Sequence, residues 1–178
     1  MAKMVNKEEK RKQIALDCKD LFLQKGIKKI TVSELANAAG IGKGTIYEYF
    51  SNKEDIVFEI LNILSEEYYE RMLLQMQNKT TLEKLNIFFE FFVTKKDDLI
   101  KIYKEFLAIN LSEEQKFIEF HSFLKETYLS LLKEIVEDEK VSEILLSYAT
   151  GYFLQKETTL KKEEFLGVEI YKMLKGKL

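Results

Sequence analysis

The sequence of 178 residues contains no proline and no tryptophan, and it has only one cysteine and one histidine. Because proline breaks helices, its absence favours long, uninterrupted helices. The lone Cys18 excludes an intramolecular disulfide framework, so the composition does not require an oxidising compartment. Long apolar runs are also missing: the longest, residues 87–93, already contains Glu90, whereas a membrane-spanning helix needs roughly 20 apolar residues.

No apolar run follows the lysines near the N-terminus, so we expect no signal peptide. With the absences above, this predicts a cytoplasmic protein that has no membrane partner. Hydrophobic residues make up 46% of the chain and charged residues 33%, a balance that supports a packed core rather than disorder.

Charge is distributed unevenly along the chain, although the formal net charge is only −2. Residues 1–53 contain eleven Lys or Arg and six Asp or Glu, which gives +5, whereas residues 54–178 contain seventeen and twenty-four, which gives −7. A basic segment suits a surface that faces phosphates, and an acidic segment would be repelled from the same polyanion. The sequence therefore predicts a basic head and an acidic body that differ in their partners.

Apolar residues recur at helical spacing through the chain, and no alternating strand pattern of useful length appears. Thr31 with Glu34, and Ser51 with Glu54, have the spacing of capping boxes, which start helices. We therefore predict an all-α fold of about nine helices. Their expected ranges are 7–25, 31–39, 43–50, 51–77, 81–94, 97–110, 113–137, 140–156 and 162–175.

Residues 31–50 have the properties of a helix-turn-helix. Two short helices that cross closely need a small side chain on the first and a glycine in the turn, and Ala36 and Gly40 fill these roles. Apolar residues in phase would face the neighbouring helices: Leu35, Ala39, Ile41, Ile46 and Tyr49. An ordinary surface hairpin is the alternative, but it leaves unexplained why residues 41–47 contain no acidic group.

The exposed side of the second short helix carries small or hydrogen-bonding groups. These residues, Lys43, Gly44, Thr45 and Tyr47, suit a DNA major groove about 12 Å wide. Thr45 and Lys43 are placed to reach bases, and Lys53, at the start of the next helix, is placed to meet a phosphate.

At these positions the chain resembles the tetracycline-repressor-like (TetR) family of bacterial regulators. The resemblance lies in Thr31, Leu35-Ala36, Ala39-Gly40, Lys43 to Tyr47, Tyr49-Phe50 and Lys53-Glu54, at unbroken spacing. It implies that the third helix enters the major groove, that Tyr47 and Lys53 contact backbone phosphates, and that the body binds a small effector. Gly42 departs mildly from the pattern, because the family often has a serine there.

These considerations give a division into a helix-turn-helix DNA-binding domain at residues 1–53 and a helical effector-binding and dimerisation domain at residues 54–178. The candidate contacts to double-stranded DNA are Thr31, Ser33, Lys43, Gly44, Thr45, Tyr47, Tyr49 and Lys53.

The body is rich in aromatic residues, most of which must form core. The resemblance implies a cavity for a small apolar or aromatic effector, and helical phase suggests its lining: Phe92, Tyr103, Phe106, His121, Tyr128 and Tyr148. His121 is either a hydrogen-bond donor to such an effector or a satisfied core histidine, and the second interpretation is the more common one.

Apolar stripes mark the last two expected helices, which either close the body or cover the same helices of a second chain. The resemblance favours a homodimer through Ile144, Tyr148, Gly151, Tyr152, Leu166, Ile170 and Met173.

The sequence offers no phosphate loop, no nucleophile elbow and no clustered metal ligands beside His121 or Cys18. We therefore expect no cofactor, no metal and no enzymatic activity. A ligand-responsive repressor that binds a palindromic operator as a homodimer is the first hypothesis. A DNA-bound scaffold or nucleoid factor, with a protein partner and no small-molecule effector, is the second.

Overall fold

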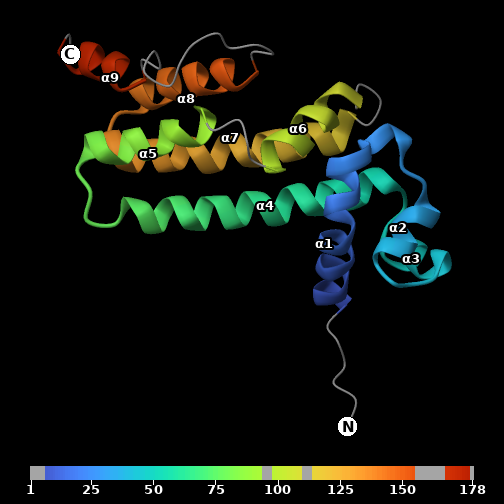
Figure 1. The fold of residues 1–178 in the computed structure, drawn as a ribbon. Helices are drawn as coiled ribbons and strands as arrows, with labels where there is room; N and C mark the ends of the chain where they lie inside the picture. Colours follow the sequence, from blue (N-terminus) through green and yellow to red (C-terminus); the bar gives the residue numbers. More distant parts are fainter. Residues whose placement is uncertain (1–6, 94–97, 110–113, 155–166, 177–178) are drawn as a thin grey trace. The chain divides into compact units, whose positions relative to one another are not determined.

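A computed structural model describes residues 7–93, 98–109, 114–154 and 167–176 (Figure 1). Within these ranges the regular secondary structure is helical, which confirms the all-α prediction. The α-helices are α1 (Lys7–Lys25), α2 (Val32–Ala38), α3 (Lys43–Tyr49), α4 (Lys53–Met76), α5 (Thr81–Val93), α6 (Asp98–Ile109), α7 (Glu114–Val136), α8 (Glu139–Leu154) and α9 (Gly167–Lys175), with a short 3-10 helix η1 (Ile27–Lys29) after α1.

The chain forms two compact units. Of the described residues, unit 1 comprises 7–69 and 98–109, and unit 2 comprises 70–93, 114–154 and 167–176. Helix α4 contributes residues to both units, and α6 belongs to unit 1 although it lies in the middle of the sequence. The boundary expected after residue 53 separates a DNA-binding domain from an effector-binding and dimerisation domain. It stays a prediction.

The core of unit 1 begins with one face of α1. Ile14, Cys18 and Phe22 are buried there, as their helical spacing indicated. The Cys18 thiol donates to the Leu35 carbonyl oxygen at 3.5 Å and so links α1 to α2. Burial, with a smaller contribution from Asp17, raises the pKa of Cys18 to about 12. This cysteine is therefore a protonated packing residue rather than a reactive thiolate.

Helix α6 packs against α1 and η1 in unit 1. Glu105 accepts a hydrogen bond from the Ile27 backbone N–H at 2.9 Å, and Lys19 pairs with Asp98 at 3.1 Å. The ring of Phe106 meets that of Phe58 edge-on at 5.4 Å between centroids. Residues 48 to 79 positions apart in the sequence thus meet in this unit.

Unit 2 is built from α5, α7, α8 and α9, which pack on one another largely through apolar side chains. Phe88 is fully buried in α5, and its ring lies 6.1 Å from that of Tyr128 on α7. At the start of α9, a Cβ atom on Gly167 would lie 2.5 Å from the Phe89 ring. Only glycine allows this approach of α9 to α5 without movement of the ring.

The start of α4 differs from the expected capping box of Ser51 and Glu54. Asn52 is the N-cap residue, and its side-chain oxygen accepts from the Asp55 backbone N–H at 2.7 Å. The Asp55 carboxylate in turn accepts from the Ser51 backbone N–H at 3.0 Å. The cap therefore begins one residue later than predicted, and it uses Asp55 in place of Glu54.

No helix in the described ranges is long and apolar enough to cross a membrane. They likewise contain no group of three or more His, Cys, Asp or Glu side chains placed to hold a metal ion.

Candidate nucleic-acid interface

The start of α2 is fixed by the predicted capping box. The Thr31 hydroxyl oxygen accepts from the Glu34 backbone N–H at 3.3 Å, and the Glu34 carboxylate accepts from the Thr31 backbone N–H at 2.9 Å. Lys25, which lies 2.7 Å from Glu34, contributes most to lowering the pKa of that carboxyl to about 2, followed by the hydrogen bonds from Thr31. The α2 terminus is thereby tied to the end of α1.

The turn between α2 and α3 is a Schellman motif. The Ile41 N–H donates to the Ala36 carbonyl at 3.0 Å, and the Gly40 N–H donates to the Asn37 carbonyl at 3.1 Å. Gly40 has a φ of 63°, a left-handed conformation that glycine adopts without steric cost. A Cβ atom there would meet nothing within 4 Å. The turn thus needs glycine because of its backbone conformation. The reason expected from the sequence was instead a close crossing of the two helices.

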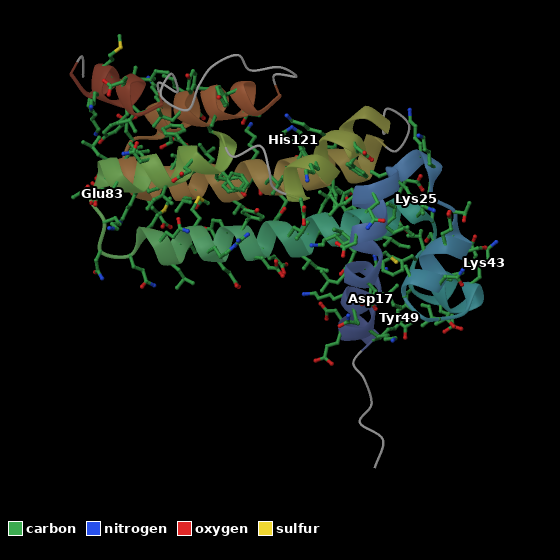
Figure 2. The ribbon with its side chains drawn as sticks, in the orientation of Figure 1. Asp17, Lys25, Lys43, Tyr49, Glu83 and His121 are labelled. Atoms are coloured by element: carbon green, nitrogen blue, oxygen red, sulfur yellow. The ribbon has the colours of Figure 1, made fainter. Side chains whose placement is uncertain are left out.

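Gly42 is the N-cap residue of α3, and it has no side chain to cap the helix. The inner side of α3 carries Ile46, which is buried, and Phe50, which directly follows the helix, is buried as well. Its outer side exposes Lys43, Gly44 and Tyr47. Of these, Lys43 is labelled in Figure 2. The helix therefore presents the predicted surface to solvent while its other side is anchored in unit 1.

Two details of this surface were not anticipated. Thr45, predicted to reach bases, is half-buried in the free chain. Glu48 is exposed beside Tyr47, four residues after Gly44, and so shares the outer side of α3. The same helical spacing that selected Lys43 and Tyr47 would have identified Glu48, whose carboxylate is able to accept from a cytosine amino group.

Lys53 reaches back toward the linker between η1 and α2. Its ammonium donates to the Lys28 and Ile30 carbonyl oxygens, each at 3.2 Å. An ammonium has three N–H donors, so one remains for another acceptor. The predicted phosphate contact is compatible with this arrangement, and it stays a prediction.

The other candidate DNA contacts lie around α2 and α3. Ser33 and Thr31 are exposed, but the Thr31 hydroxyl hydrogen already points to Glu34 at 2.9 Å. Tyr49 is half-buried at the end of α3. All eight candidates belong to unit 1, and their roles toward DNA stay predictions.

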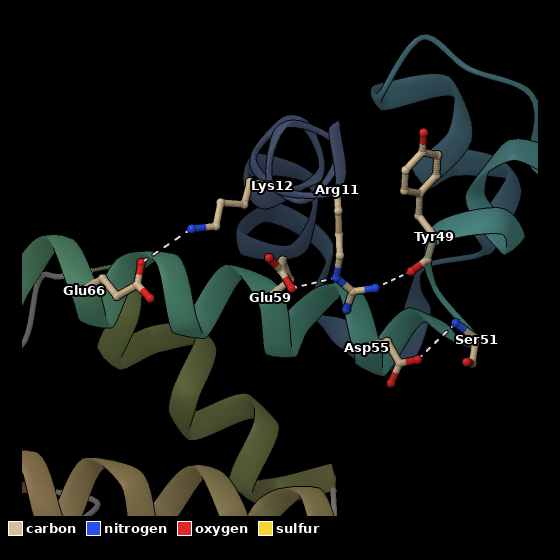
Figure 3. A network of polar contacts seen from close by, with 7 residues as sticks. All are labelled: Arg11, Lys12, Tyr49, Ser51, Asp55, Glu59 and Glu66. Carbon is tan, nitrogen blue, oxygen red and sulfur yellow. Dashed lines mark hydrogen bonds and ion pairs between the residues drawn. The ribbon is translucent and has the colours of Figure 1, made fainter. Parts of the chain in front are cut away.

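Arg11 of α1 makes contacts with the end of α3 and with α4 that the sequence did not reveal (Figure 3). Its guanidinium donates to the Tyr49 carbonyl oxygen at the end of α3 and to the Glu59 carboxylate of α4 at 2.8 Å. It also lies 4.2 Å from the centroid of the Phe50 ring. The two hydrogen-bond partners, Tyr49 and Glu59, are 38 and 48 residues from Arg11 in the sequence. No local pattern of residues could therefore have identified these contacts.

The residues proposed for an effector pocket are divided between the units. Tyr103 and Phe106 are buried in unit 1, and burial raises the pKa of Tyr103 to about 12. His121 and Tyr148 are half-buried and Tyr128 is buried, all in unit 2, while the side chain of Phe92 lies outside the described residues. The pocket stays a prediction.

The residues proposed for a dimer interface include large apolar side chains that a single chain leaves uncovered. Ile144 is 45% exposed and Met173 is 61% exposed. Gly151 is exposed, Tyr148 and Ile170 are half-buried, Tyr152 is buried, and Leu166 lies outside the described residues. The interface stays a prediction.

The fold and the helix-turn-helix together define a DNA-binding regulator of transcription, and comparisons with known proteins agree. Residues 19–60 match the family described as bacterial regulatory proteins, tetR family. The helix-turn-helix segment of this chain is therefore similar to that of the tetR family. It is 28% identical to the transcriptional regulator QacR of Staphylococcus aureus over 147 residues, which cover 75% of this chain and 78% of QacR.

Two further proteins are similar. The transcriptional repressor KstR2 of Rhodococcus jostii is 33% identical over 116 residues, which cover 63% of this chain but only 52% of KstR2. The fatty acid degradation regulator FadR of Bacillus halodurans has a similar fold, with a TM-score of 0.65 at 23% identity over 95% of this chain and 96% of FadR.

Proposed function

We propose that this protein is a ligand-responsive repressor that binds a palindromic operator as a homodimer through α3. The observation that carries the proposal is the two-sided character of α3: Ile46 is buried in unit 1, whereas Lys43, Gly44 and Tyr47 are exposed. Such a helix presents hydrogen-bonding groups to a major groove while its inner side fixes its orientation. The name of KstR2 as a repressor supports the sign of regulation.

The experiment that tests DNA binding is selection of a duplex from a randomised library by the wild-type chain. We expect enrichment of a palindrome whose half-sites are spaced by about one helical turn, roughly 34–36 Å. Thr45→Ala is expected to change the preference at particular base pairs, whereas Tyr47→Phe should weaken all duplexes similarly. Enrichment of no sequence over the starting library would contradict the proposal.

Dimerisation is supported by the exposure of Ile144 on α8 and Met173 on α9. A lysine in place of Ile144 should produce monomers, which bind the selected duplex far more weakly because they lose the avidity of two half-sites. Ile118→Lys is the matched control, because Ile118 on α7 is similarly exposed, at 47%, and lies outside the proposed interface. Sedimentation of wild type as a monomer at micromolar concentration would exclude the homodimer.

The effector part of the proposal rests on the members of the predicted pocket that lie together in unit 2, His121, Tyr128 and Tyr148. Their rings supply area, and their few polar groups supply orientation. A small apolar or aromatic molecule should weaken operator binding by roughly 5- to 150-fold, which corresponds to a coupling of about 1–3 kcal/mol. Linkage requires that the selected duplex weaken the molecule by the same factor. Thermal shift and calorimetry with a panel of such molecules, with and without the duplex, measure both sides of the linkage.

A further inference from the structure

We propose that Arg11 is a positioning residue that fixes the orientation of α3 by binding its last carbonyl group to α1 and α4. The inference rests on the proposed function, in that the orientation of α3 matters because α3 meets DNA. The residue itself is on α1, outside the helix-turn-helix.

The first argument concerns the end of α3. The last carbonyl groups of a helix have no partner within the helix and carry partial negative charge, so a cation is favourable there. The Arg11 guanidinium donates to the carbonyl of Tyr49, the last residue of α3. It also covers the ring of Phe50, the C-cap residue, at 4.2 Å from the centroid. A cation over an aromatic ring adds a second attraction at the same helix end.

The second argument concerns α4. Arg11 Nε donates to Glu59 Oε2 at 2.8 Å, and the Glu59 side chain is only 14% exposed. One residue along α1, Lys12 approaches Glu66 of the same helix α4 at 3.8 Å, with exposures of 44% and 60%. Solvent and salt weaken an exposed pair of this kind. The Arg11 pair is shorter and less exposed, so it is the stronger of the two links between α1 and α4.

The third argument concerns the chemistry of the side chain. A guanidinium is planar, always charged and has several N–H donors in a fixed fork, so it binds the Tyr49 carbonyl and Glu59 at once while it stacks on Phe50. Lysine presents a single nitrogen and cannot reproduce this geometry. Helix α3 has only seven residues, and productive contacts require placement within about 0.5 Å. Loss of the fork should therefore affect recognition more than stability.

The experiment compares Arg11→Met with Lys12→Met, a matched change on the neighbouring residue. The probes are a duplex selected by the wild-type chain and a duplex of unrelated sequence, at a temperature where each variant is folded. We expect Arg11→Met to bind the selected duplex roughly ten-fold more weakly. The unrelated duplex should be bound almost as before, and the salt dependence should be unchanged. Lys12→Met should resemble wild type.

A second readout needs no DNA. Hydrogen exchange of the Phe50 amide, which donates to Ile46 at 2.9 Å across the last turn of α3, should become faster in Arg11→Met and not in Lys12→Met. If Arg11→Met fails to fold, Arg11→Lys and Glu59→Gln replace it, and each should shift both readouts in the same direction by a smaller factor.

Two results would overturn the proposal. Unchanged affinity together with unchanged exchange would show that α3 does not need Arg11. Equal weakening of both duplexes, with the salt slope reduced by about one, would instead make Arg11 a phosphate contact. If the wild-type chain selects no duplex, the proposed function fails, and hydrogen exchange still decides whether Arg11 holds α3.

Discussion

The described polar contacts differ in their sequence separation between the two units of this chain. In unit 1, polar groups far apart in the sequence meet: Arg11 with Glu59, Lys53 with the carbonyl of Lys28, and Glu105 with the amide of Ile27. In unit 2, contacts such as those of Thr150 with the Leu146 carbonyl and of Lys133 with Glu139 join residues four and six positions apart. The helices there meet through buried aromatic and aliphatic side chains.

This difference explains why unit 1 is easier to recognise from its sequence than unit 2. Hydrogen bonds and a left-handed turn demand particular residue types at particular positions, whereas an apolar core accepts many combinations of similar volume. The segment that matches the family, residues 19–60, lies within unit 1. Unit 2 lies outside this matched segment.

The largest expected effect tests whether buried aromatic side chains stabilise unit 2. Phe88→Ala in α5 should reduce the free energy of unfolding by about 3–5 kcal/mol, because the ring is fully buried and leaves a cavity. Phe123→Ala on α7 makes the same change at a side chain that is 52% exposed. It should alter stability by about 0.5 kcal/mol or less. Urea denaturation measures both, and equal losses would mean that unit 2 is not held by its buried aromatics.

Local signals made most of the fold predictable from the sequence. The α1 range of 7–25 and the Thr31 capping box are as expected, because helical spacing and caps depend on residues a few positions apart. Ser51 and Asn52 are both suitable N-caps, and each has an acidic residue three positions later, so spacing alone did not choose between them.

The candidate site was predictable to the same extent. The exposure of Lys43 and Tyr47 follows from helical phase within seven residues. The Arg11 contacts, and the bonds from Lys53 to the Lys28 and Ile30 carbonyls, depend instead on how separate helices meet. A tertiary arrangement of that kind leaves no period or motif in the sequence.

The next largest effect on stability concerns two capping boxes, one in each unit. Thr31 with Glu34 in unit 1 and Thr80 with Glu83 in unit 2 form capping boxes of almost equal geometry, with backbone N–H bonds to the carboxylate of 2.9 and 2.8 Å. Replacing either threonine with alanine should cost about 1 kcal/mol of stability at neutral pH. Thermal unfolding of the two variants checks this equality.

The pH dependence of stability should differ between the two capping boxes. The pKa of Glu34 is lowered from 4.5 to about 2, first by Lys25 and then by Thr31, whereas that of Glu83 is lowered mainly by Thr80. A depressed folded-state pKa stabilises the protein above the unfolded value, and this contribution is lost as the pH falls from about 4.5 toward the folded value. Alanine removes only the hydroxyl bond and keeps the backbone N–H bond at either position. Thr31→Ala, in which Lys25 also remains, should therefore keep most of its acid sensitivity, and Thr80→Ala should lose a larger share. Identical acid profiles would indicate that Lys25 adds nothing.

The smallest expected effect concerns Lys53, which serves the architecture of unit 1 and is also predicted to contact DNA. Its bonds to the Lys28 and Ile30 carbonyls leave one N–H free, so Lys53→Ala should weaken selected and unrelated duplexes alike. It should also reduce the slope of log affinity against log salt by about one phosphate's worth.

Lys133→Ala is the matched control for that experiment, because it removes the same charge from unit 2, where Lys133 pairs with Glu139. The control should leave the salt slope unchanged, since only a cation that displaces counterions from DNA contributes to it. Lys53→Ala could lower the unfolding temperature but leave the slope of log affinity against log salt equal to that of Lys133→Ala. In that case the Lys53 ammonium binds only the Lys28 and Ile30 carbonyls and no phosphate. The polar contacts that hold unit 1 together would then be separate from its DNA-facing surface, and Tyr47 would be left as the predicted phosphate contact.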